Sequence, residues 1–195
     1  DILFEDEDII VINKPFGLVT HPGAGNWSGT LANALLYYDS NLSNIDRAGI
    51  VHRLDKNTSG LMVVAKNIKS QKFLVEQLQT YSVEREYSAI VYGHMISGGT
   101  INEPIGRDSK DRVKQTVMAN GKEAITYYRA IDRFKSHTHV KAILETGRTH
   151  QIRVHLSYLG HPLIGDPTYG GRVRFPKKAS QELKDGLVSC QRQAL

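Results

Sequence analysis

Cysteine is almost absent from this chain of 195 residues, in which Cys190 stands alone. One cysteine cannot form an internal disulfide, so packing must stabilise the fold, and a reducing compartment such as the cytoplasm is expected. Long hydrophobic runs are also missing. The longest, Leu61 to Ala65, is far shorter than the roughly 20 residues that cross a bilayer, and the acidic start DILFEDEDII is unlike a signal peptide. We therefore expect no membrane segment.

The signatures of several enzyme classes are missing as well. His52, Asp55 and the scattered histidines could be imagined as metal ligands, but no HExxH motif or Cys/His spacing is present, so we expect no metal site. The G-x-S-x-G elbow of serine hydrolases and the Walker phosphate loop are absent too. Metal-dependent, serine-hydrolase and P-loop chemistry are thus disfavoured by the sequence.

What the chain does contain is a moderate excess of basic residues, with a formal net charge of +5 and 40% hydrophobic residues. The hydrophobic share suffices for a packed core. The basic residues gather in GRDSKDRVKQ, GRTHQIR and GGRVRFPKK, which could follow a phosphate backbone or form an ordinary solvated surface. Lys114 lies in the first cluster and is a candidate RNA contact.

Hydrophobic periodicity predicts alternating strands and helices. Period-2 or short buried runs predict strands in DIIVINKP, GLMVVAKN, VEREYSAIVYG, AITYYRAI and THVKAILET. Helical spacing predicts helices after Thr30, over about 68–79, from about Thr149 to Leu159 and in ASQELKDGL. Glycines and charges predict an exposed, hairpin-rich insertion from Ser97 to Lys122. These elements predict one α+β domain.

Asp55 is the most ambiguous residue of the chain. Before Lys-Asn-Thr-Ser-Gly it would usually be a turn carboxylate. However, His52 and Arg53 bring basic groups to the same segment, and nearby cations favour an ionised carboxylate, which is a nucleophile or an electrostatic stabiliser. Both interpretations stay open on the residues alone.

Two arginines flank THQI, five positions apart. On one helix they would diverge by about 140°, so they cannot grip one small anion together. A plausible division is that Arg148 meets backbone phosphate at the helix start while Arg153 reaches a buried carboxylate such as Asp55. The alternative for either residue is a surface arginine.

Three long motifs, in order along the chain, resemble the RluA family of pseudouridine synthases. They are GIVHRLDKNTSGLMVVAKN, REYSAIVYGHM and LETGRTHQIRVHLSYLGHPLIGDPTYGG, and NKPFGLVTHPGAGN and GKEAITYYR extend the likeness over nearly the whole chain. The resemblance implies a pseudouridine synthase fold: a mixed, mostly antiparallel, bisected sheet flanked by helices, with a central RNA-binding cleft. It also implies isomerisation of uridine in RNA without a cofactor.

The resemblance also assigns residues. Asp55 falls on the family's catalytic aspartate, Tyr87 on its active-site tyrosine, and Arg153 on the basic residue that pairs with the aspartate. Arg53 matches the arginine beside the aspartate, near the place that the target nucleotide leaves. We further expect RNA contacts from His52, Arg148, His150 and Gln151.

For the organisation of the chain, we expect residues 1–195 to form the catalytic domain. Members of this kind usually carry an N-terminal S4-like RNA-binding domain and run on into a further C-terminal strand, and we expect neither within this sequence. The expected partner is large-subunit (23S) ribosomal RNA or a pre-ribosomal particle, and the expected targets are stem-loop uridines. We expect the protein to bind this RNA as a monomer. The alternatives are a non-catalytic RNA-binding or ribosome-assembly module on the same fold, and a metal-dependent nuclease.

Overall fold

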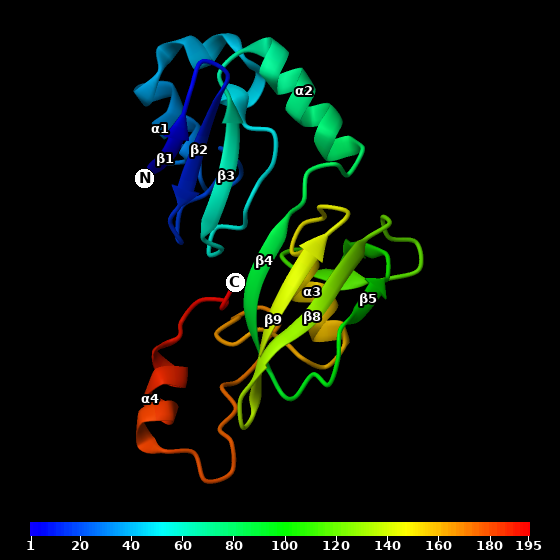
Figure 1. Ribbon diagram of the computed structural model, residues 1–195. Coiled ribbons are helices and arrows are strands. Elements are labelled where there is room, and N and C mark those ends of the chain that lie inside the picture. Colours follow the sequence, from blue (N-terminus) through cyan, green and yellow to red (C-terminus); the bar gives the residue numbers. More distant parts are fainter. The chain divides into compact units, whose positions relative to one another are not determined.

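The computed structural model describes all 195 residues, which form two compact units, Asp1–Val83 and Glu84–Leu195. The α+β class is confirmed, and every strand pair is antiparallel. No helix is long and apolar enough to span a membrane. Each unit is described by itself below (Figure 1).

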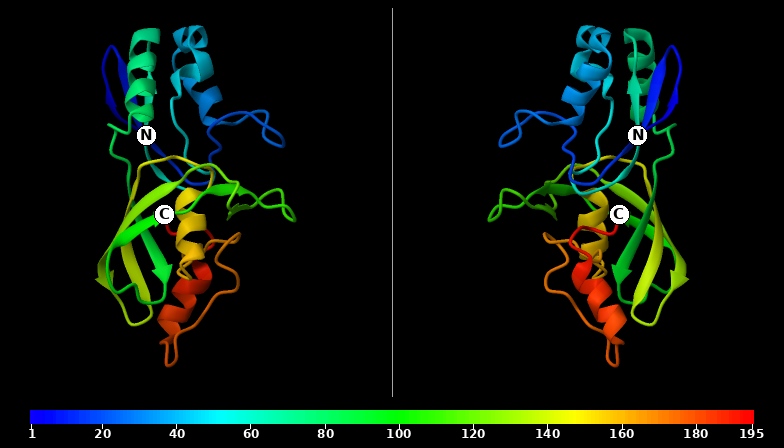
Figure 2. Two further views of the ribbon diagram at one scale, coloured as in Figure 1. Left: turned by 90° about the vertical axis from the view of Figure 1, so that its right-hand side faces the viewer. Right: turned by 90° about the vertical axis from the view of Figure 1, so that its left-hand side faces the viewer.

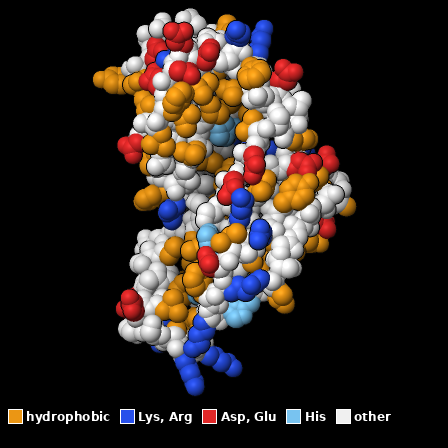
Figure 3. Space-filling model, in the orientation of Figure 1, with side chains coloured by type: hydrophobic (Ala, Val, Ile, Leu, Met, Phe, Trp, Pro, Cys, Tyr) orange, Lys and Arg blue, Asp and Glu red, His pale blue; other side chains and the backbone are white.

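The first unit is a three-stranded sheet with two α-helices and two short 3-10 helices. Its strands lie in the order β1-β2-β3. The elements are β1 (Ile2–Glu5), β2 (Ile9–Lys14), α1 (Leu31–Tyr38), η1 (Ser40–Asn44), η2 (Asp46–Gly49), β3 (Gly60–Ala65) and α2 (Ile68–Gln79). The predicted helix over 68–79 is confirmed, and so is the cap at Thr30, whose hydroxyl accepts from Asn33 N. Hydrophobic side chains gather on the face of this unit that Figure 3 shows. Leu3 of β1 and Leu61 of β3 are exposed.

The second unit contains a four-stranded sheet in the order β4-β9-β8-β5 and a two-stranded sheet, β6-β7. Its elements are β4 (Glu86–Tyr92), β5 (Gly99–Asn102), β6 (Ile105–Arg107), β7 (Gln115–Val117), β8 (Ile125–Arg133), β9 (His137–Leu144), α3 (Gln151–Tyr158) and α4 (Gln181–Ser189). The predicted strands and helices of this half are thus present. Strand β4 pairs with β9 in continuous register, from Glu86 opposite Ile143 to Tyr92 opposite His137.

The main core of the second unit lies between its four-stranded sheet and α3. Val91 and Val140 from the sheet and Leu156 from α3 are completely buried in one cluster. Two expectations need correction. Helical spacing from Thr149 predicts that Leu159 faces inward with Ile152 and Leu156, but Leu159 is 36% exposed because α3 ends at Tyr158. The segment from 97 to 122 is not wholly exposed, since its strands carry Ile101 into the main core and Ile105 into a smaller buried cluster.

Candidate active site

Asp55 lies in the loop between η2 and β3 of the first unit and is half-buried. Its own main-chain carbonyl accepts a hydrogen bond of 3.1 Å from Thr58 N. The turn predicted from Lys-Asn-Thr-Ser-Gly is therefore present, and it carries the chain into β3. The turn is a property of the main chain and does not by itself assign a role to the carboxylate.

The main chain is held on both sides of Asp55. On one side, the Leu54 carbonyl accepts a bond of 3.0 Å from the Thr20 hydroxyl, and the Leu54 side chain is buried. On the other side, the Lys56 carbonyl accepts from Gly17 N at 2.8 Å and from Lys14 Nζ at 3.2 Å. Carbonyls tied down before and after a residue fix where its side chain begins, which is the preorganisation that a reacting carboxylate needs.

Lys14 is the residue that sequence reasoning missed. It ends β2 fully buried, and its ammonium also donates to the Pro15 and Leu18 carbonyls, each at 2.9 Å. Burial lowers the pKa of Lys14 to about 8, and the charge of the Asp55 carboxylate acts in the opposite direction. The signal in the sequence was a lysine inside an apolar strand, directly before a proline.

The turn before this loop has an unusual backbone. Arg47 and Ala48 have φ values of 55° and 53°, and Gly49 follows at 77°. A Cβ on Gly49 would meet the Ala65 carbonyl oxygen at 1.9 Å, so only glycine fits. Positive φ at two consecutive non-glycine residues costs free energy that the surrounding packing must offset, a cost often concentrated near functional sites.

His52 and Arg53, both predicted to contact RNA, differ in their surroundings. His52 Nε2 accepts a hydrogen bond of 3.0 Å from Val63 N, so the ring helps to hold the loop on β3. Accepting at Nε2 places the proton of the neutral ring on Nδ1. Arg53 is exposed. Their contacts with RNA stay predictions, and exposure makes Arg53 the better placed of the two.

In the second unit, Tyr87 lies on β4 opposite Ala142 of β9. Its side chain is partly buried and packs against the main core, together with the buried Ala89 and Val91 on the same face. The predicted alternation of this strand is confirmed. The expected role of Tyr87 as the active-site tyrosine stays a prediction.

Arg153, buried on α3, forms a bidentate ion pair with Asp166, a partner that the sequence did not reveal. Its Nε and Nη2 donate to the two oxygens of Asp166 at 2.8 and 2.9 Å. Burial tends to raise the pKa of Asp166, but the bonds from Arg153 and from the main chain of Thr168 and Tyr169 outweigh it, so the pKa is lowered.

The guanidinium of Arg153 also stacks over the Tyr169 ring, with 4.9 Å to its centroid. The expectation that Arg153 meets a buried carboxylate is confirmed. The carboxylate is that of Asp166, in the segment GDPTYGG, where the sequence indicated only a glycine-rich loop. The predicted bond from Arg153 to Asp55 stays a prediction.

Gln151 requires a correction. It was expected to contact RNA, but it is 3% exposed and all its amide hydrogen-bonding capacity is used inside the unit. Its oxygen accepts from the Thr146 hydroxyl and Arg148 N, and its nitrogen donates to the Ile125 carbonyl and the Thr126 hydroxyl. Gln151 therefore joins the start of α3 to β8 and does not face RNA.

The neighbouring residues of this segment remain accessible. Arg148 precedes α3 rather than starting it, and its Nε donates to the Glu123 carbonyl at 2.7 Å. His150, in the left-handed conformation at the helix cap, places Nδ1 2.8 Å from the Tyr169 hydroxyl. Both are partly exposed, so their predicted RNA contacts stand as predictions.

A groove of about 600 Å³ lies beside Arg148. Three cationic side chains, Arg107, Lys122 and Arg148, line it, together with Gln115 of β7. The loop between β6 and β7, which carries Lys114, projects from this unit in Figure 2. Lys114 makes only a weak pair of 3.8 Å with Asp111 and does not line the groove.

No cluster of three or more His, Cys, Asp or Glu residues in the 195 residues could hold a metal ion. The sites around Asp55 and Arg153 are built instead from hydrogen bonds and ion pairs of the chain itself.

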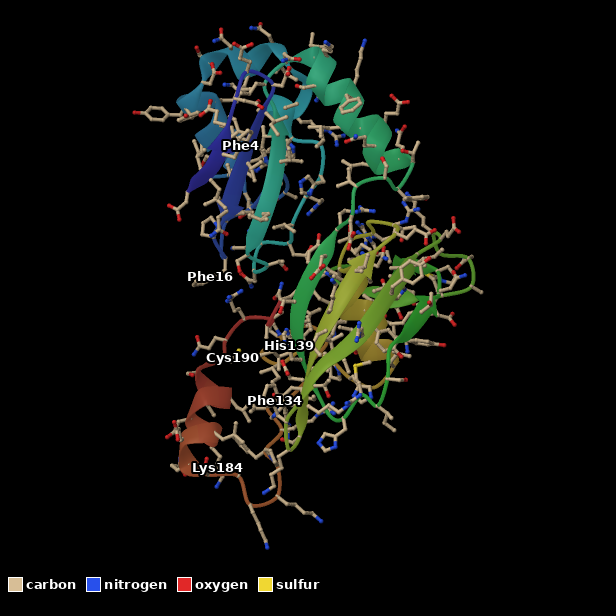
Figure 4. The ribbon with its side chains drawn as sticks, in the orientation of Figure 1. Phe4, Phe16, Phe134, His139, Lys184 and Cys190 are labelled. Carbon is tan, nitrogen blue, oxygen red and sulfur yellow. The ribbon has the colours of Figure 1, made fainter.

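Phe16, labelled in Figure 4, lies past the end of β2 in the turn that Lys14 holds, and it is 62% exposed.

Comparison with known proteins gives these sites a context. The chain is 57% identical over 195 residues to ribosomal large subunit pseudouridine synthase D of Pseudomonas aeruginosa and 55% identical to that of Escherichia coli K12. These alignments cover 100% of this chain but 61% and 60% of the relatives, so the chain spans less than two thirds of their length.

Solved structures agree with the sequence matches. Human RNA pseudouridylate synthase domain containing 4 is 28% identical, with a TM-score of 0.74, over 99% of this chain and 80% of that one. Human RNA pseudouridylate synthase domain containing 1 is 29% identical, with a TM-score of 0.71, over 87% and 69%. Residues 8–158, which include Asp55, Tyr87 and Arg153, match the family described as RNA pseudouridylate synthase. The chain therefore belongs to the RNA pseudouridylate synthase family.

Proposed function

We propose that this protein isomerises uridine to pseudouridine in RNA, with Asp55 as its catalytic carboxylate. The observation that carries the proposal is the loop of Asp55, whose main chain is tied down at Leu54 and at Lys56, in a chain that belongs to a family of RNA pseudouridylate synthases. Such anchoring on both sides fixes the position from which the side chain extends, as suits a reacting carboxylate.

The reaction needs one fixed carboxylate and a dry pocket. The C1′–N1 bond breaks, the uracil turns, and C5 bonds to C1′ while the hydrogen on C5 is released. An ionised Asp55 serves this sequence either by attacking C1′ or by taking a 2′ proton. Glycosidases use two carboxylates because they must activate a water, whereas here water has to be excluded.

The other proposed residues position the base. A uridine inside a helix cannot be reached, so it must flip out of the stack. Tyr87 then forms a wall for the uracil, Arg53 occupies the vacated place, and Arg153 pairs with Asp55. The exposure of Arg53 and the partial burial of Tyr87 against the core support these roles.

The proposed substrate is large-subunit ribosomal RNA, free or in a pre-ribosomal particle, because the relatives from both bacteria are named for that subunit. Stem-loop uridines suit an enzyme that must unstack its target. The groove lined by Arg107, Lys122 and Arg148 supplies charge that fits a phosphate backbone. We further propose that the protein acts as a monomer in the cytoplasm, where its single cysteine would stay reduced.

Tritium release tests the proposal. Large-subunit ribosomal RNA carrying tritium at uridine C5 is incubated with the protein, and pseudouridines are then mapped along the RNA. The proposal predicts release of label and new pseudouridines at a few stem-loop positions. RNA that is bound tightly but releases no label would favour a non-catalytic RNA-binding module and would overturn the assignment as an enzyme.

A further inference from the structure

The loop from His21 to Gly29 presents the only tryptophan of the chain to solvent. Trp27 is 77% exposed. The loop projects from the first unit next to α1 in Figure 2. Gly23 and Asn26 exchange two main-chain hydrogen bonds, of 3.1 and 2.8 Å, so Trp27 directly follows a tight hairpin turn. An indole on such a turn presents a large, flat face to solvent, on which a planar group can stack.

The base of this loop is firmly anchored. Leu31 N donates to the Val19 carbonyl at 2.8 Å and Ala32 N to the Thr20 carbonyl at 3.1 Å, which joins the entry of the loop to the first turn of α1. The hydroxyl of the same Thr20 holds the Leu54 carbonyl beside Asp55. One residue thus ties the Trp27 loop and the Asp55 loop to a common point.

The surroundings of the loop are cationic. Arg47 and Arg53 are both exposed. Burial lowers the pKa of His21, at the start of the loop, and the charges of Arg47 and Arg53 lower it further, against an opposing effect of Asp46. The two guanidinium groups therefore lie close enough to act on the loop, and His21 itself is neutral at pH 7.

An exposed ring beside guanidinium groups fits single-stranded RNA. Unpaired bases stack on aromatic side chains, while arginines meet the adjoining phosphates. The rest of the turn is small or polar (Gly23, Ala24, Gly25, Asn26, Ser28). A protein partner would instead favour a continuous apolar patch.

We propose that Trp27 stacks on an unpaired base of the substrate RNA, close to the uridine on which Asp55 acts. This inference rests on the proposed function, because it names the part of the chain that positions the same RNA. Trp27 is a positioning residue, not a catalytic one. It contributes to RNA binding and leaves the chemistry at Asp55 unchanged.

Tryptophan fluorescence tests the inference directly, since Trp27 is the chain's only indole. The protein is titrated with a ribosomal RNA stem-loop while indole emission is followed, and tritium release from the same RNA is measured in parallel. Stacking predicts quenching that saturates with RNA binding. Trp27→Ala should raise KM on the order of tenfold with kcat little changed, and Trp27→Phe should restore most of the affinity.

The matched control is Tyr37→Ala on α1, which removes a ring that is 95% exposed in the same unit. It should leave KM unchanged. Saturating RNA that leaves the indole emission unaltered, or equal KM values for Trp27→Ala and Tyr37→Ala, would overturn the role of Trp27 while tritium release still supported the enzyme. Absence of tritium release from every RNA would instead remove the proposed function.

Discussion

The hydroxyl of Thr20 donates a buried hydrogen bond of 3.0 Å to the carbonyl of Leu54, the residue before Asp55. Thr20→Val should leave that carbonyl unsatisfied and destabilise the fold by about 1–3 kcal/mol. Because the Asp55 loop loses an anchor, kcat should fall about tenfold or more, with a smaller change in KM. Denaturant unfolding and tritium release measure the two effects.

The control for this change is Thr20→Ser, which keeps the hydroxyl. It should retain most of the activity of the wild type. Full activity in Thr20→Val would show that the bond to Leu54 does not position Asp55.

Lys14 should report on the charge of Asp55. The pKa of Lys14 is about 8 in the folded protein, below its ordinary 10.5, and Asp55 works to raise it. Removing that charge in Asp55→Asn should lower the pKa of Lys14 further, as measured by NMR titration of its side-chain carbon and nitrogen signals. An unchanged value would mean that the carboxylate does not act on Lys14.

The same shift predicts how stability depends on pH. Between about pH 8 and 10.5 the unfolded chain binds more protons at Lys14 than the folded chain does. The contribution of Lys14 to the free energy of unfolding therefore increases as pH rises through that window. Lys14→Met should remove this contribution. If the free energy of unfolding depends on pH in the same way in the wild type and in Lys14→Met, the burial of a charged Lys14 is contradicted.

The pair of Arg153 and Asp166 should be important for stability. Asp166→Asn removes one charge of a buried pair and should destabilise the fold by about 3–5 kcal/mol. Because the folded-state pKa of Asp166 is lowered, the stability that it supplies is complete above its ordinary 3.8 and is lost as pH falls through the lower folded value. Acid unfolding should show this loss in the wild type and not in Asp166→Asn.

Phosphate contacts should appear in the salt dependence of RNA binding. Neutralising Arg148 or Lys114 should weaken binding and reduce the slope of log affinity against log salt by about 0.7–0.9 for each phosphate that the variant no longer neutralises. Lys72→Gln, on the exposed side of α2, is the control and should change neither quantity. If the slope stays the same for Lys114 but falls for Arg148, the RNA path follows the groove and not the β6-β7 loop.

Local signals made much of the fold predictable. The end of β2 before Pro15 and the helix over 68–79 follow from proline chemistry and from helical spacing over twelve residues. The residues around Asp55 predicted its turn, whereas its catalytic role was indicated only by the resemblance to a known family.

The remaining site residues depend on contacts between distant segments. Lys14 meets Lys56 42 positions away, and Asp166 meets Arg153 across a loop, so neither role is visible in a periodic pattern. Gln151 was misjudged because its sequence neighbours are basic, whereas its hydrogen-bond partners on β8 lie 25 and 26 positions away. Long-range hydrogen bonds thus decide which polar residues are interior.

The most direct test of Asp55 as the catalyst is tritium release by Asp55→Asn on a labelled ribosomal RNA that the wild type modifies. Asp185→Asn, which alters an exposed carboxylate on α4, is the matched control. We predict no release by Asp55→Asn, with RNA binding retained and with release by Asp185→Asn equal to that of the wild type. Undiminished release by Asp55→Asn would contradict the assignment of Asp55 as the catalyst.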